Sequence, residues 1–76
     1  MAVRYDRIRH LMAARRSQGL TVRQMALQAG VRMQTLYEIQ AGDEPGLTVD
    51  TMVKLCRYFG VAIEYLVEVD LEAAAV

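Results

Sequence analysis

Side chains with reactive chemistry are few in this 76-residue chain. It has one cysteine, Cys56, and one histidine, His10, so it can form no internal disulfide and offers no credible set of metal ligands. The sequence shows no activated nucleophile, no carboxylate pair suited to acid–base catalysis and no glycine-rich phosphate loop. It therefore predicts a protein that is not an enzyme and needs no metal or cofactor, with Cys56 as a small core residue.

Charge is distributed unevenly although the net charge is zero. Residues 1–37 hold seven arginines and one aspartate, a net charge of +6, whereas residues 38–76 hold two bases and eight acids, a net charge of −6. The local field matters more to a nucleic acid than the total charge does. The basic half is therefore expected to face phosphates, while the acidic half faces solvent or another protein.

Apolar content is high for so short a chain. A domain of this size buries only about 60% of the surface that its unfolded chain exposes, yet 54% of the residues are hydrophobic. We therefore expect a second subunit to cover part of the apolar surface. No stretch reaches the roughly 18 apolar residues of a membrane span and the N-terminus lacks the apolar centre of a signal peptide, so we expect a cytoplasmic protein without membrane contact.

Four glycines divide the sequence into five predicted helices. Three of the four are followed at once by an apolar residue, as is typical where a helix ends on a left-handed glycine. Thr21 and Gln24 predict a capping box at the start of the second helix, and Thr48 predicts the cap of the fourth. The helices are expected at about 3–18, from 22 to the glycine at 30, at about 33–41, from 49 to the glycine at 60, and over a short stretch that carries Ile63, Leu66 and Val67.

The sequence of the last ten residues fits two kinds of secondary structure. Val67, Val69 and Leu71 alternate with acidic residues, which fits a strand with one buried face as well as the fraying end of a helix. No linker and no repeat divides the sequence. We therefore predict one all-α domain over residues 1–76, with its core at about 4–68 and a tail at 69–76 that is either strand or disordered.

A close pair of helices is predicted around Gly30. The second and third helices are each about nine residues long and are joined by a turn of three to four residues, which is the spacing of a DNA-reading helix pair. Ala26, four residues before Gly30, is small enough to let the two helices approach. Met25, Leu36 and Ile39 are expected to bury the inner side, which leaves the outer side free to enter a groove.

The order of caps, glycines and apolar positions resembles the lambda-repressor/Cro-like (Xre-type) helix-turn-helix family. The resemblance covers roughly residues 7–66. It implies a five-helix domain and a homodimer that binds palindromic operator DNA, usually to repress transcription. The matching positions are Leu20, Thr21, Met25, Ala26, Gly30, Val31, Thr35, Leu36, Ile39, Gly42, Pro45, Thr48 to Met52, Phe59, Gly60 and Val61.

The same resemblance implies which residues contact double-stranded DNA. The start of the second helix would face a phosphate, and the base-reading positions map onto Met33, Gln34 and Glu38. Gln34 can bond an adenine edge twice, Glu38 can accept from a cytosine amine, and Met33 suits a thymine methyl group. The complete predicted set is Thr21, Arg23, Gln24, Arg32, Met33, Gln34, Thr35, Tyr37 and Glu38.

More apolar side chains lie in the C-terminal third than one short helix can bury. We expect a dimer interface there, since a single half-site would give too small a contact for useful affinity; the alternative is an ordinary core followed by a loose end. The predicted residues of this dimer interface are Tyr58, Tyr65, Leu66, Val69 and Leu71.

The alternative function is a protein-interaction module, such as the antitoxin of a toxin pair, whose acidic half binds a basic protein partner.

Overall fold

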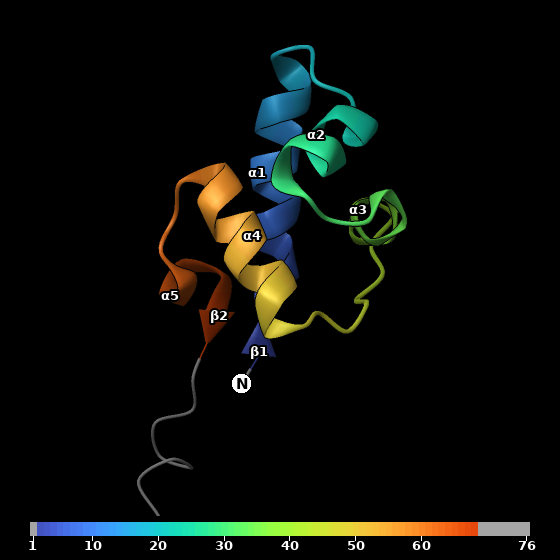
Figure 1. Cartoon of the computed structure of the whole chain (residues 1–76). Helices are drawn as coiled ribbons and strands as arrows, with labels where there is room; N and C mark the ends of the chain where they lie inside the picture. The colour runs from blue at the N-terminus through green and yellow to red at the C-terminus, as the bar shows by residue number, and fades with distance from the viewer. Residues whose placement is uncertain (1, 69–76) are drawn as a thin grey trace, which may run out of the picture.

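A computed structural model describes residues 2–68 of the chain. Figure 1 shows α1 and α4 at the centre of the molecule, with α2 and α3 on one side and α5 with the two strands on the other. The predicted five helices and their order are confirmed. The elements are β1 (Ala2–Val3), α1 (Tyr5–Ser17), α2 (Val22–Ala29), α3 (Met33–Gln40), α4 (Val49–Phe59), α5 (Ile63–Leu66) and β2 (Val67–Glu68).

Threonine caps start α2 and α4 where the sequence predicts them. The Oγ1 atom of Thr21 accepts the N–H of Gln24 at 3.1 Å, and Oε1 of Gln24 accepts the N–H of Thr21 at 2.8 Å. These reciprocal bonds complete a capping box. Thr48 accepts the N–H of Thr51 at 3.2 Å in the same way. Each cap satisfies an N–H group that has no partner inside its own helix, so the start of the helix is fixed locally.

Left-handed glycines end the same two helices. Gly30 has a φ of 74° and Gly60 a φ of 69°, a conformation that a residue with a Cβ atom adopts only at a cost. The N–H of Gly30 donates to the carbonyl of Ala26, and that of Gly60 to the carbonyl of Cys56. These bonds satisfy the last carbonyl groups and turn the chain away from the helix axis.

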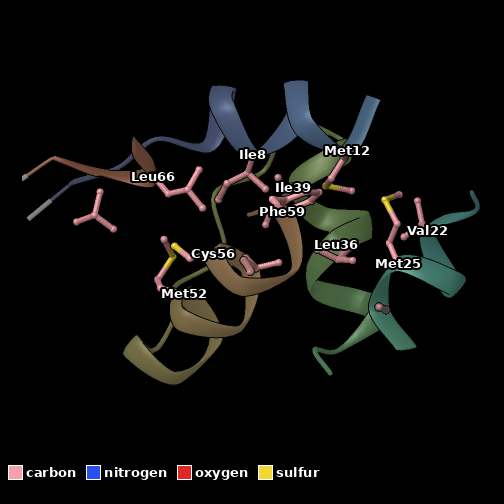
Figure 2. Packing of buried hydrophobic residues seen from close by; sticks show 13 residues of the cluster. Ile8, Met12, Val22, Met25, Leu36, Ile39, Met52, Cys56, Phe59 and Leu66 are labelled. Atoms are coloured by element: carbon pink, nitrogen blue, oxygen red, sulfur yellow. The ribbon is translucent and has the colours of Figure 1, made fainter. Parts of the chain in front are cut away.

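One apolar core joins all five helices. Figure 2 shows the buried side chains converging between the helices, and no polar or charged side chain is buried among residues 2–68. Cys56 is among the buried residues, which confirms its prediction as a core residue. Hydrophobic burial is therefore the main stabilising contribution. The buried set is Ile8, Met12, Val22, Met25, Ala26, Leu36, Ile39, Met52, Leu55, Cys56, Phe59, Leu66 and Val67.

The two strands pair the ends of the described chain and correct two predictions. Val3 is not the start of a helix and Val67 is not part of α5: Val3 pairs with Val67, and Ala2 with Glu68, in antiparallel register. These residues form strands because each segment finds its backbone hydrogen-bond partners in the other segment, which is distant in the sequence. Local sequence signals therefore do not indicate the strands. The strand interpretation of the chain's end is confirmed for residues 67 and 68, whereas Val69 and Leu71 lie outside the described residues.

Candidate nucleic-acid interface

Helices α2 and α3 form a closely packed pair. Gly30, Val31 and Arg32 separate them, and Ala26 of α2 is buried. A small side chain at a buried helix position lets a neighbouring element pack closely, as a larger one would not. The inner residues Met25, Leu36 and Ile39 are also buried, as the sequence predicts. The orientation of α3 is therefore fixed by core packing, which leaves its outer face available for contacts.

The outer face of α3 is exposed along the helix. Met33 is 44% exposed and Tyr37 is 47% exposed, while Arg32 and Gln34 are exposed beside them. Neither Met33 nor Gln34 belongs to the buried core, so both side chains offer surface for contacts outside the protein. The remaining two α3 residues of the predicted site, Thr35 and Glu38, are half-buried.

Gln34 and Glu38 are hydrogen-bonded to each other. The Nε2 atom of Gln34 donates to Oε1 of Glu38 at 3.1 Å, as residues four apart on a helix can do. The backbone carbonyl of Glu38 accepts the N–H of Asp43 at 2.9 Å, which anchors the turn after α3. From the sequence, the two side chains are predicted to read bases separately, whereas in the structure they form a hydrogen-bonded pair.

The start of α2 presents a different kind of site. The N–H of Gln24 bonds to the Thr21 side chain, and the N–H of Met25 bonds to the Thr21 carbonyl at 3.0 Å. The N–H groups of Val22 and Arg23 therefore remain at the open end of the helix. Because the positive end of the helix dipole lies here, this end favours an anion such as a phosphate. Thr21 and Gln24 also hold each other in place through the capping box.

Two N-terminal arginines bind the C-terminal end of the described chain. Arg4 forms an ion pair with Glu68 at 2.9 Å. Arg7 donates to the carbonyl oxygen of Tyr65 at 2.9 Å, and its guanidinium lies 4.6 Å from the centre of the Tyr65 ring. A guanidinium over an aromatic face is attracted by the ring. These contacts fasten α1 to α5 and β2, so both arginines have structural partners.

Two further arginines of α1 contact other helices. Arg15 donates to the carbonyl of Tyr58 at 3.4 Å and lies 5.1 Å from the centre of its ring. Arg9 donates to the carbonyl of Ile39 near the end of α3 at 3.4 Å. The expectation that the basic half as a whole faces phosphates is therefore revised, because these two arginines support the fold.

Three of the seven arginines in residues 1–37 are exposed at the surface. Arg16 lies near the end of α1, Arg23 in the first turn of α2 and Arg32 at the cap of α3, and all three are exposed. Within residues 2–68 none of them forms an ion pair or a side-chain hydrogen bond. Arg23 and Arg32 flank the helix pair, which supplies positive charge where a nucleic-acid backbone would approach.

The predicted dimer residues differ in their exposure. Leu66 is fully buried in the core, so the prediction that it contacts a second subunit is wrong: it has no free surface for a partner. Tyr65 is 38% exposed on α5. Tyr58 is half-buried, and its hydroxyl donates to Oε1 of Gln28 at 2.9 Å. Val69 and Leu71 lie outside the described residues.

Sequence reasoning missed Ile63 as a surface residue of α5. It is 41% exposed, whereas Leu66, three residues later, is fully buried. No local signal separates them, because both are apolar and both lie on the same predicted face of a short helix. Ile63 and Tyr65 are thus two partly exposed apolar side chains on α5.

A comparison with known protein families matches the model described as Helix-turn-helix over residues 11–66, which includes α2, α3, α4 and α5 in full. The chain belongs to the helix-turn-helix family. It is a helix-turn-helix protein of the lambda-repressor/Cro-like (Xre) type, a family of DNA-binding transcription regulators. No curated protein and no solved structure matches it significantly. In the part of this helix-turn-helix protein that the structure describes, no helix has the length and apolar character needed to cross a bilayer.

Proposed function

We propose that this helix-turn-helix protein is a sequence-specific repressor that binds palindromic operator DNA in the cytoplasm as a homodimer, without catalysis and without a cofactor. The observation that carries the proposal is the two-sided character of α3. Leu36 and Ile39 are buried on its inner side, while Met33 and Gln34 are exposed on its outer side. A helix held in this way can enter the major groove with polar side chains directed at base edges.

Phosphate contacts position the protein on the duplex in this proposal. The free N–H groups of Val22 and Arg23 at the start of α2 bind one phosphate. The oxygen of the Thr21 hydroxyl accepts from Gln24, which leaves the hydroxyl hydrogen to be donated to the same phosphate. The exposed guanidinium groups of Arg23 and Arg32 bind phosphates on either side. These contacts set the position of α3 in the groove without reading sequence.

Base contacts supply the specificity. Met33 packs against a thymine methyl group, Gln34 bonds an adenine edge and Glu38 accepts from a cytosine amine. Thr35 and Tyr37 lie at the margins of this surface. The proposed half-site therefore has a mixed composition, in contrast to the uniform sites of proteins that read only guanine through arginine.

Two subunits are required because one helix-turn-helix contact is small. The partly exposed apolar side chains of Ile63 and Tyr65 on α5 support the use of this helix as the dimer contact, since apolar surface is preferentially covered by a partner. A two-fold symmetric dimer places its two reading helices about one helical turn of DNA apart, about 10 base pairs. The operator is therefore expected to be palindromic.

Selection of binding sites from random duplex DNA with the purified protein tests the proposal. We expect enriched duplexes to carry two inverted half-sites whose centres are about 10 base pairs, or a multiple of that distance, apart. Binding should also weaken steeply with salt, because cations are released from each contacted phosphate. Selection without enrichment, or affinity that does not depend on salt, would instead favour the protein-interaction module.

A further inference from the structure

We infer that Glu38 is a specificity-determining residue that makes Gln34 select adenine and reject guanine. The inference rests on the proposed function, since α3 must reach base edges for either side chain to matter. The hydrogen bond between the two side chains determines which donor and acceptor groups of the Gln34 amide remain available for a base. Glu38 thereby gains a role besides its own contact with DNA.

The orientation of the Gln34 amide follows from the chemistry of its partner. An ionised carboxylate accepts hydrogen bonds but donates none. The amide nitrogen of Gln34, and not its carbonyl oxygen, must therefore face Glu38, as the 3.1 Å contact between Nε2 and Oε1 shows. Without such a partner, a glutamine amide can rotate by half a turn and exchange the positions of its donor and acceptor.

The hydrogen bond to Glu38 uses one of the two N–H groups of the amide. Gln34 then presents one donor and one acceptor to a base. Adenine offers a matching pair in the major groove, with its N7 atom as acceptor and its N6 amine as donor. Guanine offers two acceptors, N7 and O6, and needs two donors. The Gln34 amide can satisfy adenine while bonded to Glu38, but it can satisfy guanine only by breaking that bond.

Two features of Glu38 keep it available for this role. Its backbone carbonyl accepts the N–H of Asp43 at 2.9 Å, so the last turn of α3 is anchored. Glu38 is half-buried, whereas Gln34 is exposed, so the protein covers part of the side chain that orients the Gln34 amide. The second oxygen of the Glu38 carboxylate remains an acceptor for an amine on a neighbouring base.

Affinity measurements with the full chain and single base-pair variants of the selected operator test this inference. The base pair read by Gln34 is the one at which Gln34→Ala loses discrimination. Duplexes with adenine or guanine at that position are titrated with the wild-type chain, with Glu38→Ala and with Glu38→Gln. Asp6→Ala removes the same charge from an exposed position on α1 and serves as the control.

We expect the wild-type chain to prefer adenine over guanine by about tenfold to a hundredfold. In Glu38→Ala this ratio should fall at least about fivefold, because the Gln34 amide is then free to offer both N–H groups to guanine. In Glu38→Gln it should fall as well, because an amide at this position can donate as well as accept and so no longer fixes the orientation of the Gln34 amide. The control should keep the wild-type ratio. Loss of a negative charge near DNA raises affinity for both duplexes alike, so the ratio is unaffected by it.

Three results would overturn the inference. If the wild-type chain discriminates but both Glu38 variants keep its ratio, or if the wild type selects guanine at the Gln34 position, Glu38 does not set the specificity and the proposed function stands. Binding of the wild-type chain without any sequence preference would instead overturn the proposed function and the inference together. Thermal unfolding of each variant, followed by circular dichroism, verifies that all are folded.

Discussion

Gln34 and Leu36 lie only two residues apart on α3, yet one is exposed and the other is buried. This contrast separates two kinds of effect that a substitution in α3 can have. Changes at the outer residues alter contacts with DNA, whereas changes at the inner residues create cavities and lower stability. Single-residue tests of the site are therefore interpretable when they are confined to the outer face.

Gln34→Ala should weaken binding to the selected operator by about 1–3 kcal/mol, while binding to unrelated duplex DNA stays unchanged. The reason is that Gln34 contacts a base edge, which only the specific complex contains. Competition of labelled operator against both kinds of unlabelled duplex measures the two affinities. An equal loss on both duplexes would remove Gln34 from the base-reading residues.

The Cys56 thiol makes the stability of the protein depend on alkaline pH. Burial raises the pKa of Cys56 above its ordinary value of 9.0, and the Glu64 carboxylate adds to the shift. The folded chain therefore holds this proton more tightly than the unfolded chain does. The contribution to stability is complete below the ordinary pKa and is lost as the pH rises through the folded value.

We expect the free energy of unfolding to fall as the pH rises above about 9, and to fall less steeply in Cys56→Ala. Urea titrations at several pH values measure both slopes. Burial also raises the pKa of Tyr5 from 10.0, with Glu44 adding to it, so a second loss begins at higher pH. Equal slopes for the wild-type chain and Cys56→Ala would contradict the assignment to the thiol.

At the scale of helices, α2 and α4 allow a matched comparison. Both start at a threonine whose side chain accepts a backbone N–H three residues later, at 3.1 Å for Thr21 and 3.2 Å for Thr48. Only the start of α2 belongs to the proposed DNA surface. The same substitution at the two caps therefore separates an effect on helix stability from an effect on DNA binding.

Thr21→Ala and Thr48→Ala should each lower the free energy of unfolding by about 1 kcal/mol, because each removes an N-cap. Thr21→Ala should in addition weaken DNA binding, since it also removes a phosphate donor, whereas Thr48→Ala should leave it unchanged under conditions in which both variants are folded. Chemical denaturation and DNA titration give the two quantities. Equal DNA affinity in the two variants would exclude Thr21 from the DNA contact.

Ala26→Leu tests the close approach of α2 and α3. Ala26 is only 4% exposed, and a larger side chain would overpack the contact and lower stability by about 1–3 kcal/mol. Ala14→Leu places the same residue at an exposed position on α1 and should have little effect. Thermal unfolding measures both. An unchanged midpoint in Ala26→Leu would show that the two helices are not tightly packed at this point.

The helices were predictable because their signals are local. The caps at Thr21 and Thr48 and the glycines at 30 and 60 act within one turn of the chain, so they fix the ends of α2 and α4 without reference to the rest of the fold. The exposure of Gln34 likewise follows from helical periodicity once Leu36 and Ile39 are assigned to the core.

Features that depend on distant residues were not predictable. The pairing of Val3 with Val67 needs both ends of the sequence, and the burial of Leu66 beside the exposed Ile63 needs the positions of the other helices. The stacking of Arg7 on Tyr65 is also a contact between distant residues. Charge counting assigned Arg7 to a basic half expected to face phosphates, because the sequence shows how many charges are present but not which partners they have.

At the scale of the whole molecule, the proposed dimer can be tested separately from DNA binding. Ile63→Asp introduces a charge at a partly exposed apolar position on α5 and should raise the dimer dissociation constant at least about tenfold, which is about 1.4 kcal/mol. The fold should be retained because Ile63 is 41% exposed. Sedimentation equilibrium measures the association.

Leu27→Asp provides the control for this experiment. Leu27 is 74% exposed on α2, and Figure 1 shows α2 and α5 on opposite sides of the molecule. The same substitution there should leave the dimer intact. Dissociation in both variants would indicate a general effect of charge, and association of Ile63→Asp as strong as that of the wild-type chain would locate the subunit contact elsewhere.

The antiparallel pairing of Ala2 with Glu68 has a practical consequence for protein engineering. Because these positions are neighbours, a short peptide could join them into a ring, and the backbone could then be reopened in an exposed loop to give a circular permutant. Figure 1 shows β1 and β2 at the end of the molecule far from α2. A fluorescent or catalytic module fused at either strand would therefore be carried at the pole that faces away from α2.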